Sequence, residues 1–440
     1  MTMTAGYPDG AIDEMPRNQL RALQSDRLAS IVRWSYDRSP FYQRRFDEYD
    51  IDPRSIQSID DLSRLPFTVR GDLRDTYPFG MLAVPRQQLA RVQASSGTRG
   101  RLTISAYTSR DIETWAEVCA RSLALAGARP GDIVQNAYGY GLFTGGLGLH
   151  YGAERLGATV VPISGGNTLR QVKLLRDLGA DVLCCTPSYA LIIAEALERE
   201  GVTPDELPLR IGVFGAEPWS EAIRLDLEGR LGIHAIDIYG LSEVIGPGIG
   251  CECAEARDGF HIMEDHFVPE VIDPATGDLM ADGEYGELVL TTLTKEAMPM
   301  LRFRTGDITA LIDEPCSCGR THRRIARLRG RVDDMIVLHG VNVYPSEVEA
   351  TLLDFDEIAP FYQIVLDRES GRETIQVIAE ITPQYAQTVT DADMRILAGQ
   401  VERILKSRFD LNMHVRLVGP GEVGRIDSGK AGRVIDRREA

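Results

Sequence analysis

Two patterns of apolar residues divide the chain. Between residues 17 and 90, apolar side chains such as Leu20, Leu28 and Ile31 recur at roughly helical spacing among polar ones. Because positions three or four apart share one face of a helix, this stretch is predicted to be mainly helical. From residue 91 onward, short apolar runs alternate with amphipathic stretches, which indicates strands alternating with helices. Such alternation is typical of a mostly parallel sheet with helices on both faces.

The alternating part gives a series of expected elements. Strands are expected at 91–94, 102–107, 132–137, 159–163, 181–185, 210–214 and 235–239. Helices are expected at 109–126, with a serine as its cap, and at 168–178, 189–200 and 220–231. The segments after several strands are rich in Gly, Ser, Thr or Tyr, and the glycine-rich segment 138–148 is interpreted as a loop. Ligands of such sheets bind beyond the carboxyl ends of the strands, so these loops predict a common binding mouth.

The last third of the chain changes character twice. Between about 260 and 330, short strands are expected at 268–273, 286–292 and 302–312, which indicates a β-rich subdomain. From 333 onward a small α+β domain is predicted, with helices at 345–354 and 391–409 and strands at 335–338, 363–366, 375–381 and 414–417. The predicted fold class is therefore α/β. A large domain of residues 1–332 with mostly parallel sheets precedes a small α+β domain of residues 333–440.

Composition and charge narrow the classes of function. The 440 residues are 43% hydrophobic and 26% charged, as in ordinary globular proteins. A net charge of −17, from 48 basic and 65 acidic residues, argues against nucleic acid or an acidic membrane surface as the main partner. Apolar runs stay well short of the roughly 18 residues that span a bilayer. The first 16 residues lack the apolar core of a signal peptide, so we expect a cytoplasmic protein.

The cysteines suggest a metal site rather than disulfides. There are seven, an odd number, and four of them form two tight pairs. The ligands that we expect for a structural Zn²⁺ ion are Cys253, His261, Cys316 and Cys318. Cys251 and His266 are rival ligands. The alternative is buried free cysteines, which is the expectation for Cys119, Cys184 and Cys185.

One glycine-rich stretch is a candidate anion site. Residues 93–101 read Gln-Ala-Ser-Ser-Gly-Thr-Arg-Gly-Arg. Glycines let backbone N–H groups turn inward, and the hydroxyl and guanidinium groups add donors for phosphate oxygens. A flexible Ser/Gly surface loop would have a similar composition, and the glycine spacing is not that of the Walker motif. The stretch by itself leaves both interpretations open.

Five motifs in a fixed order then carry a resemblance. They read SSGTRGR from Ser95, YGLSE from Tyr239, RFRTGD from Arg302, GRVDD from Gly330 and SGK from Ser428. In this order the chain resembles the adenylate-forming superfamily of acyl-CoA synthetases, adenylation domains and luciferases. Segments 136–148, 150–154, 162–167, 264–267 and 340–345 make it closely similar to the phenylacetate–CoA ligase family. The resemblance extends from about residue 17 to the C-terminus.

The resemblance implies a two-step reaction with ATP, Mg²⁺ and coenzyme A. A carboxylate attacks the α-phosphate to give an acyl-adenylate and pyrophosphate, and a thiol then displaces AMP. Such chemistry needs positioning and charge neutralisation more than covalent catalysis. We expect an aromatic acid, phenylacetate or a benzoate- or anthranilate-like acid, as the substrate. Two alternatives stay open: a free-standing adenylase that loads a carrier-protein thiol, and a nucleotide-binding regulatory protein that has lost catalysis.

The resemblance also implies roles for individual residues. Glu243 would hold Mg²⁺ and Ser242 would contact phosphate, although both residue types also suit a helix start. Lys430 would bridge the carboxylate and the α-phosphate, and Asp333 would be the hinge about which the small domain rotates between steps. The other ATP-binding residues would be Ser95, Ser96, Gly97, Thr98, Arg99, Gly100, Arg101, Gly215, Ala216, Glu217, Asp237, Tyr239, Asp307 and Arg331.

Two expectations concern the loop chemistry and the acyl pocket. Arg99 and Arg101 stand where the family usually has Thr-Gly-Lys, so a planar guanidinium replaces an ammonium there. The acyl pocket should draw on aromatic and apolar residues of the strand-end loops, which suit an aryl ring. These are Tyr138, Tyr140, Phe143, Ala216, Gly240, Ile245 and Pro247. Individually each is more often plain core. A homodimer is a guess from the frequency of dimers.

Overall fold

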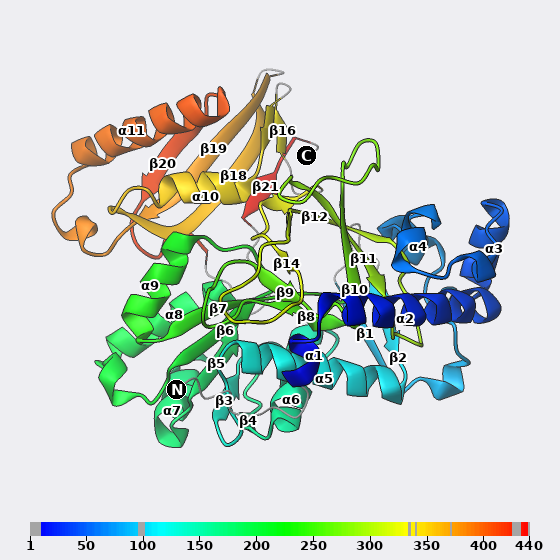
Figure 1. The fold of residues 1–440 in the computed structure, drawn as a ribbon. Coiled ribbons are helices and arrows are strands. Elements are labelled where there is room, and N and C mark those ends of the chain that lie inside the picture. The colour runs from blue at the N-terminus through cyan, green and yellow to red at the C-terminus, as the bar shows by residue number, and fades with distance from the viewer. Residues whose placement is uncertain are drawn as a thin grey trace.

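The computed structural model describes residues 10–95, 102–332, 336–338, 341–369, 372–424 and 433–438. A large N-terminal part is built on a central sheet, and a small C-terminal part lies over one end of it (Figure 1). The helices of the described residues are each too short or too polar to cross a membrane.

The N-terminal segment is mainly helical, as predicted. Its α-helices are α1 (Gly10–Asp13), α2 (Arg17–Arg38), α3 (Pro40–Glu48) and α4 (Arg70–Asp75). Leu20, Leu28 and Val32 of α2 are fully buried, because helical spacing places them on the face that meets the rest of the large domain. Pro40 opens α3, where its missing N–H has no partner to lose.

The central sheet has nine strands in the order β13-β14-β9-β8-β7-β6-β5-β3-β4. The parallel strands are β3 (Ile133–Asn136), β4 (Thr159–Val161), β5 (Val182–Cys185), β6 (Ile211–Gly215) and β7 (His234–Leu241). The antiparallel strands are β8 (Gly246–Cys251), β9 (Phe260–Ile262), β13 (Leu311–Ile312) and β14 (Arg324–Ile325). The predicted mostly parallel sheet is therefore confirmed.

Helices cover both faces of this sheet. They are α5 (Ser109–Leu125), α6 (Thr144–Leu156), α7 (Thr168–Leu178), α8 (Pro187–Arg199) and α9 (Glu221–Leu231). Alternate residues of β5 show the two faces, because Val182 and Cys184 belong to the core that includes α5 and α6, whereas Leu183 and Cys185 belong to the core of α7–α9. Both layers are needed because a parallel sheet is apolar on both sides.

Two local expectations were wrong. The cap of α5 is Thr108 and not a serine, since its hydroxyl accepts from the N–H of Asp111 while the Asp111 carboxylate accepts from the N–H of Thr108. The glycine-rich segment 138–148 is not all loop, because α6 begins within it at Thr144. A Cβ at Gly152 would lie 2.5 Å from the Cβ of Cys119, so its glycine lets α6 approach α5 closely.

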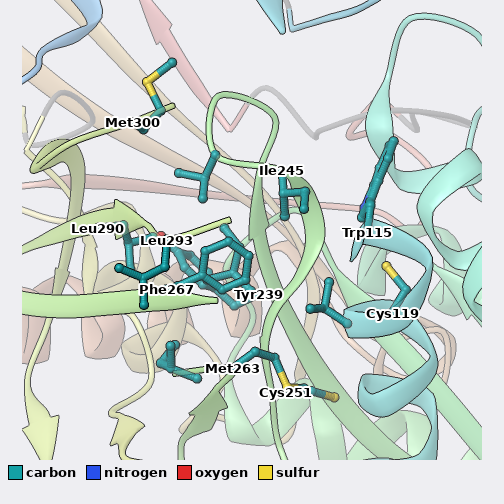
Figure 2. Close-up of a cluster of buried hydrophobic side chains, with 14 of the residues drawn as sticks. Trp115, Cys119, Tyr239, Ile245, Cys251, Met263, Phe267, Leu290, Leu293 and Met300 are labelled. Carbon is teal, nitrogen blue, oxygen red and sulfur yellow. The ribbon is translucent and has the colours of Figure 1, made fainter. Parts of the chain in front are cut away.

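Two smaller sheets complete the large domain. The hairpin of β1 (Arg91–Ser95) and β2 (Thr103–Tyr107) pairs Ser95 with Thr103 at its end. The other sheet contains β10 (Phe267–Ile272), β11 (Gly286–Thr292), β12 (Phe303–Thr309) and β15 (Gly330–Arg331). Figure 2 shows the apolar core where these elements meet α5 and β7, and Trp115, Tyr239 and Phe267 all belong to it. The expected β-rich subdomain is confirmed.

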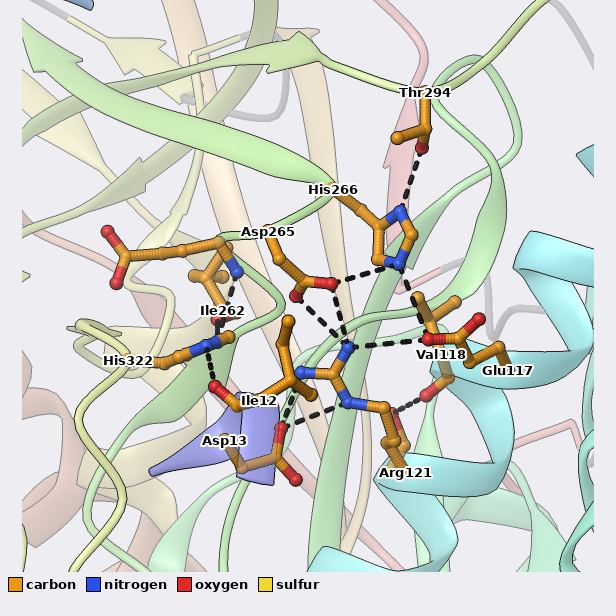
Figure 3. Close-up of polar contacts among 12 residues, drawn as sticks. Ile12, Asp13, Glu117, Val118, Arg121, Ile262, Asp265, His266, Thr294 and His322 are labelled. Carbon is orange, nitrogen blue, oxygen red and sulfur yellow. Dashed lines mark hydrogen bonds and ion pairs between the residues drawn. The ribbon is translucent and has the colours of Figure 1, made fainter. Parts of the chain in front are cut away.

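A buried ion network ties α1 to α5 and to the turn before β10 (Figure 3). Arg121 donates to the Asp265 carboxylate at 3.0 Å and is paired with Asp13. His266 lies 3.0 Å from Asp265 through Nε2 and 2.8 Å from the Thr294 hydroxyl through Nδ1. Although burial alone lowers the pKa of His266, the neighbouring Asp265 carboxylate raises it above its usual value. Charges buried in this way are tolerated because each is paired.

The C-terminal part is a small α+β unit with a core of its own. Its elements are β16 (Ile336–Leu338), β17 (Val341–Val343), α10 (Pro345–Leu352), β18 (Ile358–Glu369), β19 (Arg372–Ile381), α11 (Asp391–Phe409), β20 (His414–Val418) and β21 (Val434–Asp436). A four-stranded sheet in the order β20-β19-β18-β21 packs against both helices. Leu353 and Phe361 pack against the core of α7–α9 and so join the two parts.

Candidate active site

A cleft lies where β6 and β7 end, opposite β12 and β15. The residues that line it are Ala216, Glu217, Pro218, Trp219, Asp237, Ile238, Tyr239, Gly240, Leu241, Phe260, Asp307, Arg327, Leu328, Gly330 and Arg331. Six of the predicted ATP-binding residues are among them. Gly215 adjoins the cleft, and a Cβ there would lie 2.2 Å from the main-chain oxygen of Ile238, so only glycine fits. The cleft has the expected position at the carboxyl ends of parallel strands.

Asp307 is the centre of one side of the cleft. It lies opposite Arg331 in the β12–β15 ladder, and the Arg331 Nε atom is 3.7 Å from its Oδ1. The Tyr239 hydroxyl donates to Asp307 Oδ2 at 2.6 Å. Burial, together with the Asp307 charge, raises the pKa of Tyr239 well above its usual value, so the hydroxyl stays a donor. One carboxylate oxygen and a guanidinium therefore face the cleft together.

Asp237 lies at the other side of the cleft in an unusual electrostatic setting. Burial raises its pKa to about 8, and the adjacent Glu252 carboxylate adds to this effect. Glu252 itself is held by two hydrogen bonds of 2.8 Å from Arg224. Arg327 opposes the shift from 4.0 Å away. The raised pKa favours the protonated Asp237 carboxyl, which can donate a hydrogen bond as well as accept one.

Ser242 and Glu243 lie in the turn between β7 and β8, not at a helix start. The Ser242 hydroxyl is 3.0 Å from the hydroxyl of Thr144, the first residue of α6. The Glu243 side chain is only 7% exposed, and its Oε1 atom lies 3.7 Å from Nε of Arg70. The turn thus presents a hydroxyl and a carboxylate next to the strand that carries Asp237 and Tyr239.

The phosphate loop and two other predicted residues cannot be placed. Residues 96–101, Asp333 and Lys430 lie outside the described residues. Ser95 is described and closes the β1–β2 hairpin from which the loop extends.

The predicted acyl-pocket residues separate into two groups. Ala216 and Gly240 line the cleft. The others lie beside α5 and α6: Tyr138 follows β3, Phe143 precedes α6, and the main-chain oxygen of Pro247 accepts from Trp115 at 3.1 Å. Ile245 is buried in the apolar core of Figure 2, and the hydroxyl of Tyr140 accepts from the Asn136 amide at 2.9 Å. The roles of all seven residues in binding the acid stay predictions.

Sequence reasoning missed several residues of the site. Arg327 and Trp219 line the cleft, and Arg70 and Thr144 contact the Ser242–Glu243 turn. Lys295 was also missed, and its amine donates to the main-chain oxygen of Glu243. Arg327 precedes the GRVDD motif and Trp219 follows Glu217 closely, so proximity to motifs was an available signal for these two. The contacts of Lys295 are too remote in sequence to give one.

The four predicted zinc ligands come together. The ligand atoms of Cys253, His261, Cys316 and Cys318 all lie within 4.8 Å of one another. The Sγ atoms of Cys253 and Cys316 are 3.7 Å apart, and Cys318 Sγ is 3.5 Å from His261 Nε2. Hydrogen bonds from Cys253 and His261 lower the pKa of the Cys318 thiol, which favours a thiolate.

The rival ligands are used elsewhere. Cys251 is buried in the core of Figure 2, where burial raises its pKa well above the usual value. His266 belongs to the ion network of Figure 3.

Comparisons with known proteins identify the family. The family model for AMP-binding enzymes matches residues 81–294, and that for the AMP-binding enzyme C-terminal domain matches residues 340–438. The phenylacetate-coenzyme A ligase of Thermus thermophilus is 51% identical, over 97% of this chain and 99% of the length of that enzyme. The Escherichia coli K12 enzyme of that name is 47% identical, over 96% and 95% of the two chains. The chain belongs to the phenylacetate–coenzyme A ligase family. It is therefore an enzyme, an AMP-forming acid–CoA ligase, as the motif order predicted.

Solved structures place this family member among adenylate-forming enzymes. A 2-hydroxyisobutyryl-CoA ligase in the postadenylation state, with R3-HIB-AMP bound, superposes with a TM-score of 0.92 at 28% identity, over 100% of this chain and 95% of that one. The same ligase in its thioesterification state gives 0.72, over 98% and 92%. Since both structures are of the same ligase, the difference between the two TM-scores reflects how its domains are arranged in each state. The two parts of this chain therefore superpose better on the arrangement that this ligase has in its postadenylation state.

Proposed function

We propose that this enzyme activates an aromatic carboxylic acid, with phenylacetate as the first candidate. The acid carboxylate attacks the α-phosphate of ATP, acyl-AMP forms and pyrophosphate leaves. The CoA thiol then attacks the acyl carbon and AMP leaves. The identity to phenylacetate-coenzyme A ligases over nearly the whole chain supports this substrate. The observation that carries the proposal is the meeting of Asp237, Asp307 and Arg331 in one cleft beside the Ser242–Glu243 turn.

In the proposed site, each side of the cleft holds one part of the nucleotide. Asp307 would accept from the ribose hydroxyls, with Tyr239 and Arg331 fixing its carboxylate. Asp237 would face the adenine edge. Glu243 would hold Mg²⁺, which prefers carboxylate and phosphate oxygens, and the ion would neutralise charge on the phosphates. Residues 95–101 would bind the β- and γ-phosphates, as the resemblance of their motif implies.

The small domain would move between the two half-reactions. We propose domains of residues 1–332 and 333–440, with Asp333 as the hinge and Lys430 at the α-phosphate during adenylation. The match to a postadenylation structure supports an arrangement in which the C-terminal part serves the first step. Rotation about a few hinge residues would then exchange its face for thioester formation.

The acyl group would lie against the aromatic and apolar residues near α6. Ala216 and Gly240 reach the cleft and would border the ring of the acid. Tyr138, Tyr140 and Phe143 would form the far wall. The hydroxyl of Tyr138 is buried and has no hydrogen-bond partner among the described residues, as suits a pocket wall. Ile245 and Pro247 would support this wall from behind.

We also propose that Cys253, His261, Cys316 and Cys318 hold a structural Zn²⁺ ion. The convergence of three sulfur atoms and one imidazole nitrogen supports it, because such a set satisfies tetrahedral zinc without an open position. The ion would clamp the ends of β8, β9 and the segment before β14.

The enzyme is further proposed to be cytoplasmic and to act on small molecules. A homodimer stays a prediction.

Pyrophosphate exchange tests the proposed function. Purified enzyme is assayed with ATP, labelled pyrophosphate and a panel of aryl and aliphatic acids, followed by CoA or a carrier-protein thiol as acceptor. We expect exchange with phenylacetate and thioester formation with CoA. Exchange followed by transfer only to a carrier protein would favour the adenylase, and no exchange with any acid would refute the proposal.

A further inference from the structure

A buried lysine connects two segments of the proposed phosphate site. Lys295 follows β11, and only 2% of it is exposed. Its Nζ atom donates to the main-chain oxygen of Glu243 at 3.0 Å and to the hydroxyl of Ser105 at 2.9 Å. The ring centroid of Tyr107 lies 5.0 Å from the same nitrogen, where an aromatic face attracts a cation. The ammonium therefore has three kinds of partner and is almost fully shielded from solvent.

The two hydrogen-bond acceptors come from different parts of the site. Ser105 lies on β2, two residues beyond Thr103, which pairs with Ser95 at the end of the hairpin. It therefore belongs to the base from which residues 96–101 extend. Glu243 is the proposed ligand of Mg²⁺ and lies in the turn after β7. One ammonium group thus bonds both to the strand that follows the phosphate loop and to the main chain of the proposed metal ligand.

The lysine itself is held in place from α5. Asp111 accepts from the main-chain N–H of Glu296 at 2.6 Å and of Ala297 at 2.9 Å, immediately after Lys295. Because its own backbone is anchored, the lysine can impose a position on its partners.

A second, neutral connection exists between the same two segments. The hydroxyl of Tyr107 donates to the main-chain oxygen of Ile245 at 2.9 Å, and its ring stacks on Trp115 at 5.1 Å. The same hydroxyl lies 3.4 Å from the main-chain oxygen of Ser242, so this connection reaches the turn on either side of Glu243. The lysine adds the bond to the main-chain oxygen of Glu243 itself.

Placing a charge here is costly, which argues for a functional reason. The Lys295 side chain is almost fully buried, so its charge is taken out of water. A buried ion pair is often no more stabilising than well-packed apolar side chains. An apolar residue with a long side chain would fill the same space without the desolvation cost.

We propose that Lys295 is a positioning residue for adenylation. It holds the Glu243 main chain and the base of the phosphate loop at a fixed separation, so that Mg²⁺ and the triphosphate meet in the geometry for attack. This inference rests on the proposed function and on the proposed role of Glu243. Lys295 acts through these two segments and does not touch the substrate itself.

The test substitutes methionine, which keeps the length of the side chain and removes its donors. For Lys295→Met we expect the KM for MgATP to rise about tenfold or more, as for the loss of a hydrogen bond from a charged group. We expect kcat for pyrophosphate exchange to fall by about the same factor, because the groups near the reacting atoms would be displaced. The KM for the acid should change less than about twofold. The rate of thioester formation from supplied acyl-adenylate and CoA should also change less than about twofold, because the positions of the ATP phosphates do not affect that step.

The single variant Ser105→Ala keeps the test decisive if the lysine variant folds poorly, and a double-mutant cycle is added if it folds. Ser105→Ala alone should raise the KM for MgATP about threefold, and should add nothing when Lys295 is already methionine. An unchanged KM for MgATP in Ser105→Ala, or full additivity of the two substitutions, would overturn the proposal.

Arg121→Met is the matched control, because it also removes a buried cation that donates to an oxygen, in the network of Figure 3. We expect a lower Tm and an unchanged KM for MgATP. If both methionine variants lower Tm and leave the KM for MgATP unchanged, Lys295 is only structural. If wild-type enzyme shows no exchange with any acid, the proposed function fails, and this is a different result.

Discussion

At the scale of single residues, the cleft departs from ordinary solution chemistry mainly at Asp237. Burial and the Glu252 carboxylate raise the pKa of its carboxyl to about 8, although Arg224 and Arg327 lie close by and oppose the shift. A neutral carboxyl resembles an amide in having both a donor and an acceptor, which suits recognition of a base edge. Ionisation would replace the donor with a negative charge in the nucleotide cleft.

The sign of this shift gives a pH prediction. Because the folded pKa is raised above the ordinary 3.8, the neutral form is present at pH 7 and is lost as the pH rises through about 8. We expect the KM for ATP to rise between pH 7 and 9 in the wild-type enzyme. Asp237→Asn keeps donor and acceptor at all pH values, so its rise should be smaller. Superimposable pH profiles for the two proteins would contradict the role of Asp237.

Asp307 gives a second prediction at this scale. Asp307→Ala removes the acceptor proposed for the ribose hydroxyls and leaves the Tyr239 hydroxyl without its partner. We expect the KM for ATP to rise at least about tenfold, as for loss of hydrogen bonds to a charged group. The KM for phenylacetate should change little, and steady-state kinetics with each substrate varied will show the contrast. Equal increases in both values would place Asp307 outside the nucleotide site.

At the scale of elements, close contacts between helices position the site. Helix α6 starts at Thr144, which contacts Ser242, and its glycines let it lie directly against α5. Moving α6 away from α5 would displace Thr144 and the residues before it. The glycines therefore act on the site through packing.

A glycine substitution tests this packing. In Gly152→Ala the added Cβ would lie 2.5 Å from the Cβ of Cys119, so the helices must separate, and we expect a loss of about 1–3 kcal/mol in the free energy of unfolding. Gly229 of α9 is the control, because a Cβ there meets nothing within 4 Å and alanine favours helix by about 1 kcal/mol. Denaturant titration measures both. Equal stability of the two variants would contradict the packing argument.

The same helices show what could be predicted from the sequence. The bounds of α7 and α11 were predicted correctly, because regular amphipathic spacing is bounded by Asn167 and Gly179 in α7 and by Thr390 and Asp410 in α11. Helix α6 was missed because close packing requires glycine, which lowers helix propensity and imitates a loop. The cleft residues Asp307 and Arg331 could be found from motif order, whereas Lys295 could not. Its partner Ser105 is 190 residues away in sequence, and neither residue belongs to a motif.

The zinc site is also a prediction at the scale of elements, since its ligands join separate strands. Removal of the metal with a strong chelator, or the substitution Cys318→Ser, should lower Tm because the clamp on β9 and its neighbours is lost. The KM for ATP should stay within about twofold, as for a structural role. Cys119→Ser, at a buried cysteine outside the cluster, is the control. Metal analysis showing no zinc in protein purified without chelator would end the proposal.

At the scale of the whole molecule, the arrangement of the two parts resembles that of the 2-hydroxyisobutyryl-CoA ligase in its postadenylation state. Part of the contact between them is apolar, because Leu353 and Phe361 pack against the core of α7–α9. An interface of this kind stabilises one arrangement but can be released. Weakening this interface should shift the population of molecules away from the arrangement seen here without altering the nucleotide site.

Phe361→Ser is expected to slow pyrophosphate exchange several-fold, by analogy with the few kcal/mol that separate such states. Thioester formation from supplied acyl-adenylate should be unchanged or faster. Ile396→Ser is the control, since Ile396 is 61% exposed on α11. Equal slowing of both half-reactions would show that Phe361 supports the fold and not one arrangement.

Product analysis tests the central claim most directly. The purified enzyme is incubated with ATP, Mg²⁺, phenylacetate and CoA, and the products are separated and identified by mass spectrometry. We expect phenylacetyl-CoA, AMP and pyrophosphate in equal amounts, with phenylacetyl-AMP accumulating when CoA is omitted. Formation of ADP, or an acyl-CoA without any acyl-AMP intermediate, would contradict it.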